Sequence, residues 1–166
     1  MRRLLSALLG SLAVALSALV LAAGPAAADS PHFISEGTAS ITSTGAYNVA
    51  NFKEAGLGNL GVTSISITLS ATASATYACV NGGSNHPKAT NKESVEANVS
   101  STGTFPIRNG STTGSLSVGP PPAGPFTPSC SPPMTVVLIS VSYTNVSLSG
   151  AGATSAEPSL SATFPL

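Results

Sequence analysis

Residues 64–79 read SISITLSATASATYAC, and the rest of the chain is organised around this stretch. Apolar side chains occupy every second position from Ile65 to Cys79, and serine or threonine fills the positions between them as far as Thr76. This alternation is typical of a β-strand with one apolar and one wet face, whereas a helix would scatter the apolar groups around its circumference. The stretch therefore predicts the central strand of an all-β domain.

The chain has two cysteines, Cys79 at the end of this strand and Cys130 further along. Two cysteines in an exported protein most simply form one disulfide. The sequence thus predicts a Cys79–Cys130 bond that braces one end of the domain.

The first 28 residues combine a basic start at Arg2 and Arg3, a long apolar run and a small-residue ending, Ala26-Ala27-Ala28. This arrangement predicts a signal peptide over residues 1–28, the alternative being an uncleaved membrane anchor. We expect residues 29–166 to form a single domain with no membrane span after cleavage. The expected location is secreted, either extracellular or associated with the cell wall.

Alternating segments on both sides of the central strand predict about seven or eight strands in all. A change of period between Val49 and Phe52 favours a strand with a bulge over a short capped helical turn, and another change predicts a bulge near Asn145. Gly103 breaks the alternation that Val95, Ala97 and Val99 begin, and Phe105 and Ile107 continue it. Asn109-Gly110 predicts a hairpin turn. The pattern favours an immunoglobulin-like β-sandwich, with a jelly roll or barrel as the alternative.

Charge is scarce, with four basic and six acidic residues after residue 28. Nucleic-acid binding requires a basic surface that neutralises phosphates, so we expect no nucleic-acid partner. The histidines, His32 and His86, lack a nearby aspartate other than Asp29, so no Ser-His-Asp triad is expected. Glu93 and Glu96 would point to opposite faces of an extended strand, so they are not expected to act together as the carboxylate pair of a glycosidase. We expect no metal, no cofactor and no catalytic residues, and an enzyme with an unrecognised site is the less favoured alternative.

A polar loop after Cys79 carries the densest cluster of charged and polar side chains. It is either a solvated loop or a binding loop on a rigid scaffold. The candidate binding residues there are His86, Lys88, Asn91 and Lys92.

The serine and threonine rows beside the central strand allow two interpretations. They are either a polar lattice for sugars or ice, or ordinary solvent-facing strand residues. Sugar-binding modules often stack rings on exposed aromatic side chains. Because Tyr77 and Tyr143 share the parity of core residues, both are expected to be buried.

Three segments carry a resemblance: YACVNGGSNHPK at residues 77–88 with Asn91-Lys92-Glu93, FKEAGLG at residues 52–58, and VSYTNV at residues 141–146. Together they resemble a family of small secreted proteins from high-GC Gram-positive bacteria. The resemblance covers residues 47–148. That family has no assigned activity, so the resemblance implies a secreted β domain and no catalytic residues to transfer.

These observations predict a secreted, non-catalytic β-sandwich that acts as a binding or structural module at or near the cell envelope. Its expected partner is an envelope polysaccharide or an extracellular protein. The alternative is an extracellular protease inhibitor that presents the proline-rich loop 120–133, because a preorganised loop lowers the entropic cost of binding.

Overall fold

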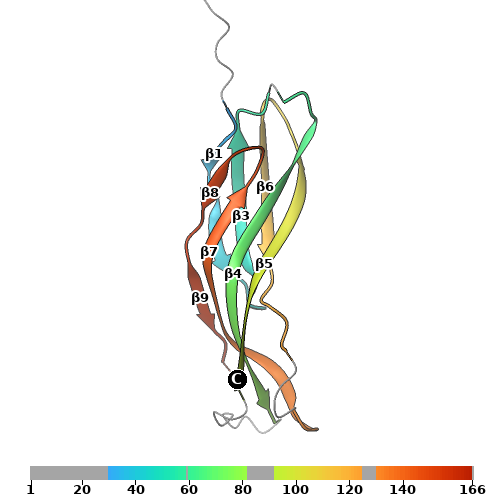
Figure 1. Cartoon of the computed structure of the whole chain (residues 1–166), viewed down its shortest axis with the longest axis vertical. Coiled ribbons are helices and arrows are strands. Elements are labelled where there is room, and N and C mark those ends of the chain that lie inside the picture. The colour runs from blue at the N-terminus through green and yellow to red at the C-terminus, as the bar shows by residue number, and fades with distance from the viewer. Residues whose placement is uncertain (1–29, 59, 82–91, 125–129, 166) are drawn as a thin grey trace, which may run out of the picture.

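The computed structural model describes residues 30–58, 60–81, 92–124 and 130–165, and in these ranges the chain forms nine strands and no helix. The strands make two antiparallel sheets (Figure 1). One sheet contains β1 (His32–Ser35), β2 (Thr38–Ile41), β3 (Tyr47–Ala55) and β6 (Ser111–Val118); the other contains β4 (Ser64–Val80), β5 (Lys92–Pro106), β7 (Thr135–Ser149), β8 (Thr154–Ala156) and β9 (Leu160–Thr163).

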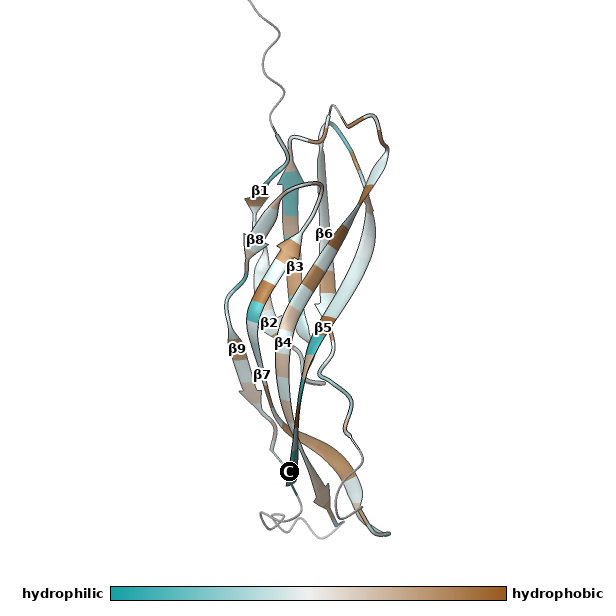
Figure 2. Ribbon diagram, in the orientation of Figure 1, coloured by the Kyte–Doolittle hydropathy of each residue, from teal (hydrophilic) through white to brown (hydrophobic). Residues whose placement is uncertain are grey.

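Strand β4 is the central strand that the sequence predicts, since it pairs with β5 on one side and with β7 on the other. Its apolar positions are buried from Ile65 to Ala75, and Figure 2 shows them as brown bands that alternate with pale ones. The alternation fixes which face of the strand turns inward, because a slip of one residue would expose every apolar side chain.

The predicted bulges are present in both sheets. The register between β3 and β6 shifts between Val49 and Phe52, where Asn51 has a φ of 60°. The register between β4 and β7 shifts beside Asn145, whose φ is 51°. Asparagine tolerates this left-handed conformation better than most residues. The strand with a bulge is therefore confirmed over the helical turn in β3.

The break in the alternation at Gly103 does not interrupt the strand. Strand β5 pairs with β4 without a register shift, and Gly103 lies opposite Ile67. A Cβ at Gly103 would lie within 2.9 Å of the Phe105 ring, so the glycine makes room for that ring and does not end the strand.

The Asn109-Gly110 turn is confirmed, but the strands that it joins belong to different sheets. Arg108 and Ser111 exchange two backbone hydrogen bonds of 2.8 and 3.1 Å, and both turn residues have positive φ. Strand β5 before the turn pairs with β4, whereas β6 after it pairs with β3. The turn is thus one of the connections between the two layers, as are the segments between β3 and β4 and between β6 and β7.

The described ranges contain nine strands instead of the expected seven or eight. Gly37, with a φ of 90°, separates the short strands β1 and β2. Strand β8 has only three residues, too few for an alternation to be recognised. The architecture is the predicted two-layer β-sandwich with one disulfide, and in the described part no strand ladder closes the sheets into a barrel.

Aromatic side chains fill the space between the layers. The Tyr47 and Tyr143 rings meet edge to face with centroids 5.4 Å apart, and the Tyr143 hydroxyl donates to the Gly45 carbonyl at 2.7 Å. Burial, the largest cause, raises the pKa of each of these tyrosines to about 12. Tyr143 is buried as expected, but Tyr77 is only half-buried, and its hydroxyl donates to the Pro121 carbonyl.

Candidate binding surface

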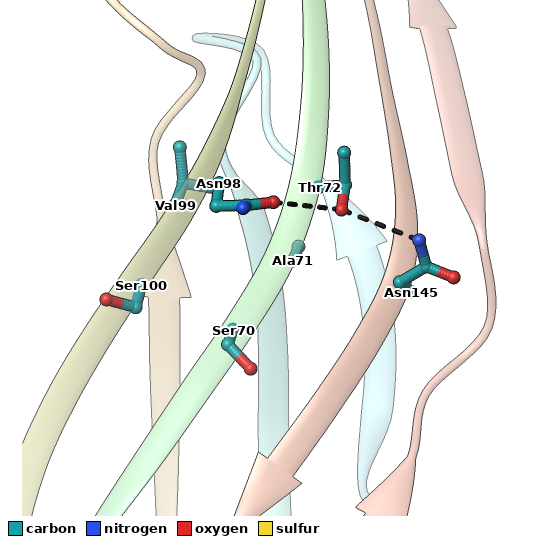
Figure 3. A pocket seen from close by; sticks show the side chains of 7 residues that line it. All are labelled: Ser70, Ala71, Thr72, Asn98, Val99, Ser100 and Asn145. Carbon is teal, nitrogen blue, oxygen red and sulfur yellow. Dashed lines mark hydrogen bonds between the residues drawn. The ribbon is translucent and has the colours of Figure 1, made fainter.

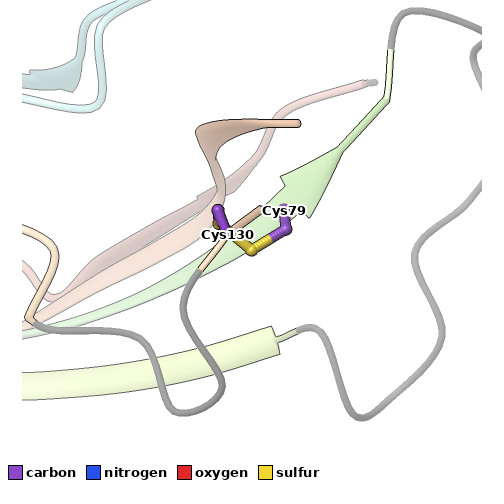
Figure 4. Close-up of a disulfide and its surroundings, with 2 residues drawn as sticks. All are labelled: Cys79 and Cys130. Atoms are coloured by element: carbon purple, nitrogen blue, oxygen red, sulfur yellow. A yellow bond between two sulfur atoms is a disulfide. The ribbon is translucent and has the colours of Figure 1, made fainter. Parts of the chain in front are cut away.

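Cys79 and Cys130 form the predicted disulfide, with Cα atoms 5.6 Å apart (Figure 4). Cys79 is buried near the end of β4, opposite Val136 at the start of β7. Since both cysteines of the chain are in this bond, neither is available as a nucleophile or a metal ligand.

The candidate binding loop is mostly outside the described ranges. His86, Lys88 and Asn91 lie among residues 82–91, and Lys92 is the exposed first residue of β5, paired with Ala78. The role of this loop stays a prediction.

The proline-rich segment is described only in part, because residues 125–129 lie outside the described ranges. Pro121 is fully buried, and its carbonyl accepts a 2.6 Å hydrogen bond from the Tyr77 hydroxyl. This part of the segment therefore packs against the sheet. The protease-inhibitor hypothesis for loop 120–133 stays a prediction.

The outer side of the β5-β4-β7 sheet is a continuous surface of hydroxyl groups, which we call the hydroxyl face. Strand pairing places outward serine and threonine residues of the three strands side by side in rows across the sheet. Neighbouring strands lie about 4.8 Å apart and successive outward residues about 6.7 Å apart, so the rows form a regular grid. The face comprises Ser66, Thr68, Ser70, Thr72, Ser74 and Thr76 of β4, Ser94, Glu96, Asn98, Ser100, Thr102 and Thr104 of β5, and Ser140, Ser142, Thr144, Asn145, Ser147 and Ser149 of β7.

Hydrogen bonds between side chains order this grid. Thr68 bonds to Thr102 at 2.8 Å, and Thr76 bonds to Ser94 at 2.9 Å. Glu96 is the only charged side chain in the set. The hydroxyl face is therefore a polar surface that offers donors and acceptors with almost no charge.

A shallow pocket of about 250 Å³ opens near the middle of the hydroxyl face, at the bulge of β7 (Figure 3). The Thr72 hydroxyl donates to Asn98 Oδ1 at 3.1 Å and accepts from Asn145 Nδ2 at 3.5 Å. The lining residues are Ser70, Ala71, Thr72, Asn98, Val99, Ser100 and Asn145.

Thr72 thus orients two amides from two different strands. Among the described residues, no protein group bonds to the remaining atoms of these amides, Asn98 Nδ2 and Asn145 Oδ1. The first is a donor and the second an acceptor, so the two amides leave one hydrogen-bonding group of each kind free, and a sugar hydroxyl can bond to either. The volume is below the roughly 300–1,000 Å³ of pockets for drug-sized ligands, so it suits a single small ring.

Sequence reasoning did not select Asn98 or Asn145 as site residues. The predicted bulge at Asn145 was the available signal, since bulges often re-aim a side chain next to a site. The pairing of β4 with both neighbours, which brings the two asparagines to Thr72, is not readable from the sequence.

The histidine and acid candidates are not brought together as a catalytic set. The His32 ring donates from Nδ1 to the Ser30 carbonyl at 2.8 Å. Glu93 and Glu96 lie on opposite sides of β5, as their spacing predicts. Across the described ranges, no group of three or more His, Cys, Asp and Glu side chains could hold a metal ion. The same ranges contain no helix that is long and apolar enough to span a membrane.

Among the described residues, the buried acidic side chains are Glu54 and Glu157. Glu54 is fully buried, and its Oε1 accepts a 3.0 Å hydrogen bond from the backbone N–H of Ala151 in the β7–β8 turn. Burial is the largest cause that raises its pKa, and it also raises the pKa of Glu157. Because Glu54 has no exposed surface, its role is to hold the turn and not to contact a ligand.

The free energy of unfolding should fall as the pH rises above about 4.5. Glu54 and Glu157 have an ordinary pKa of 4.5 and a higher value in the folded protein, so over that window the native state binds more protons than the unfolded state. Urea unfolding at several pH values measures this slope. The Glu54→Gln variant should show a flatter profile than the wild type. An unchanged slope in Glu54→Gln would contradict the assignment.

Neither protein-family models, nor curated proteins, nor solved structures match this chain.

Proposed function

We propose that this chain is a secreted, non-catalytic binding module at or near the cell envelope, and that the hydroxyl face binds an uncharged polysaccharide of the envelope. The Thr72–Asn98–Asn145 cluster in the pocket is the observation that carries the proposal. The predicted signal peptide, the disulfide and the resemblance to small secreted bacterial proteins support the location.

The chemistry of the face favours a neutral, hydroxylated ligand. Charged polymers require opposite charges, and the face offers only Glu96. A sugar hydroxyl that binds here gives up a hydrogen bond to water and forms one to the protein. The net binding free energy from each such exchange is only about 0.5–1.5 kcal/mol. Useful affinity therefore requires many contacts at once, and a repeating polymer on a repeating grid supplies them.

The test is co-sedimentation of the purified protein with envelope fractions of its host, with and without prior protease treatment of the fractions. A polysaccharide ligand predicts retention that survives the protease. Retention that the protease abolishes would replace the polysaccharide with a protein partner. No retention in either case would contradict the proposed function.

The double variant Thr72→Val with Asn98→Ala should bind the protease-treated fraction about tenfold more weakly. Losing about two hydrogen bonds of this kind corresponds to a change of that size. The matched control is Thr113→Val, which removes the same hydroxyl from an exposed position of β6 in the other sheet. Equal retention of the double variant and the control would exclude the pocket as the binding site.

A further inference from the structure

Strand β5 is an unusual sheet edge because of its length. At the opposite side of its sheet, β8 and β9 have three and four residues, and in the other sheet β1 and β2 have four each and β6 has eight. Strand β5 has 15 residues, and no described strand pairs with its outer side. Short edge strands hinder pairing with another chain, whereas a long edge with free N–H and C=O groups favours it.

The devices that usually protect an edge are missing from most of β5. Its pairing with β4 runs without a bulge, and its only proline, Pro106, is the last residue. Its charged residues, Lys92, Glu93 and Glu96, all fall in the first third, so the strand is uncharged from Ala97 onward. Bulges, prolines and charges are the features by which β-proteins prevent edge association.

The inward side chains of β5 are also incompletely covered. Val95, Ala97 and Val99 face the core side but are only partly buried, whereas the apolar residues opposite them in β4, Ala71, Ala73 and Ala75, are buried. A strand added beside β5 would cover the exposed part of these side chains, and burial of apolar surface favours association.

We propose that two copies of the chain pair antiparallel through their β5 edges about a two-fold axis at Val99. In this register all 15 residues of each β5 face the other strand, and Val99 lies opposite Val99 of the second copy. Glu96 then lies opposite Thr102 of the second copy, so no like charges meet. The charge pattern of β5 is therefore compatible with its own antiparallel copy, which favours a second copy over an unrelated strand.

The same register brings the two pockets together. Asn98 and Ser100 line the pocket, and in the paired strands Asn98 lies directly opposite Ser100 of the second copy. The two hydroxyl faces become one surface, because directly opposed residues in antiparallel strands project on the same side. Pairing would thus place two copies of the site next to each other. This inference needs no ligand and stands or falls separately from the proposed function.

Sedimentation equilibrium of the purified protein measures the pairing directly. At about 100 μM a micromolar Kd gives a mainly dimeric protein. The Val99→Lys variant, which places an inward-pointing charge at the edge, should weaken association by more than about a hundredfold. The matched control Ile34→Lys adds the same charge at an exposed position of β1 and should leave the dimer intact. A monomeric wild-type protein at this concentration, or a dimer that persists in Val99→Lys, would overturn the proposal.

Amide hydrogen exchange of the wild-type protein gives an answer that does not depend on the folding of any variant. In a monomer, the N–H groups of β5 that point away from β4 exchange quickly. In the proposed dimer these groups become protected as the protein concentration rises. Fast exchange of these groups at every concentration would contradict the pairing.

Discussion

Replacing both Cys79 and Cys130 with alanine should lower the free energy of unfolding by about 4 kcal/mol. The disulfide joins residues 51 positions apart, and closing a loop of this length restricts the unfolded chain by about that free energy at 25 °C. Typical domains have about 5–15 kcal/mol of stability, so this is a large share of the total. Equilibrium denaturation in urea with the wild type as reference measures the loss.

The position of the bond indicates where the variant should change first. Cys79 lies near the end of β4, and Val80 pairs with Thr135 at the start of β7. Without the bond, amides at this end should lose protection from exchange before those near Leu69, in the middle of the strand. Wild-type protein treated with a reductant is the matched control and should show the same loss of stability. A loss below about 1 kcal/mol would mean that the unfolded chain is already restricted without the bond.

The sequence predicts the long strands well because their signal is local. Alternation over 15 or more residues identifies β4, and the parity change identifies the bulge at Asn145. Prediction from the sequence fails where the contact that determines the structure joins residues far apart along the chain. In the sequence Gly103 is only a break in the alternation, whereas in the sandwich it makes room for Phe105. Similarly, the Asn109-Gly110 turn is readable as a turn, while the separation of its flanking strands into two sheets depends on β3 and β4.

In the candidate site, too, the local features are predictable from the sequence and the long-range contacts are not. The sequence identifies the serine and threonine rows of β4 and allows a sugar lattice as one interpretation. It cannot show that Asn98 and Asn145 meet at Thr72, because the two asparagines are 47 positions apart and join only through β4. Disulfide prediction succeeds for a different reason: with only two cysteines there is a single possible pairing.

A second large loss of unfolding free energy is expected when the aromatic contact between the two sheets is removed. Phe52 of β3 is fully buried, and its ring meets Phe105 of β5 edge to face at 5.1 Å and Phe33 of β1 at 6.5 Å. Gly114 lies opposite Phe52 in β6, and a Cβ there would clash with the Phe105 ring. The two phenylalanines therefore fill a space that the glycine leaves open, and they join one sheet to the other.

The Phe52→Ala variant should lose about 3–5 kcal/mol of unfolding free energy, since it removes a buried ring and leaves a cavity that the stiff sheets cannot close. Urea denaturation measures the loss. Ile34→Ala is the matched control: this β1 side chain is 52% exposed, so its removal should change stability by less than about 0.5 kcal/mol. Phe52→Leu, which keeps part of the volume, should fall between the two. If Phe52→Ala resembled the control, the Phe52–Phe105 contact could not be what holds the two layers together at this end of the sandwich.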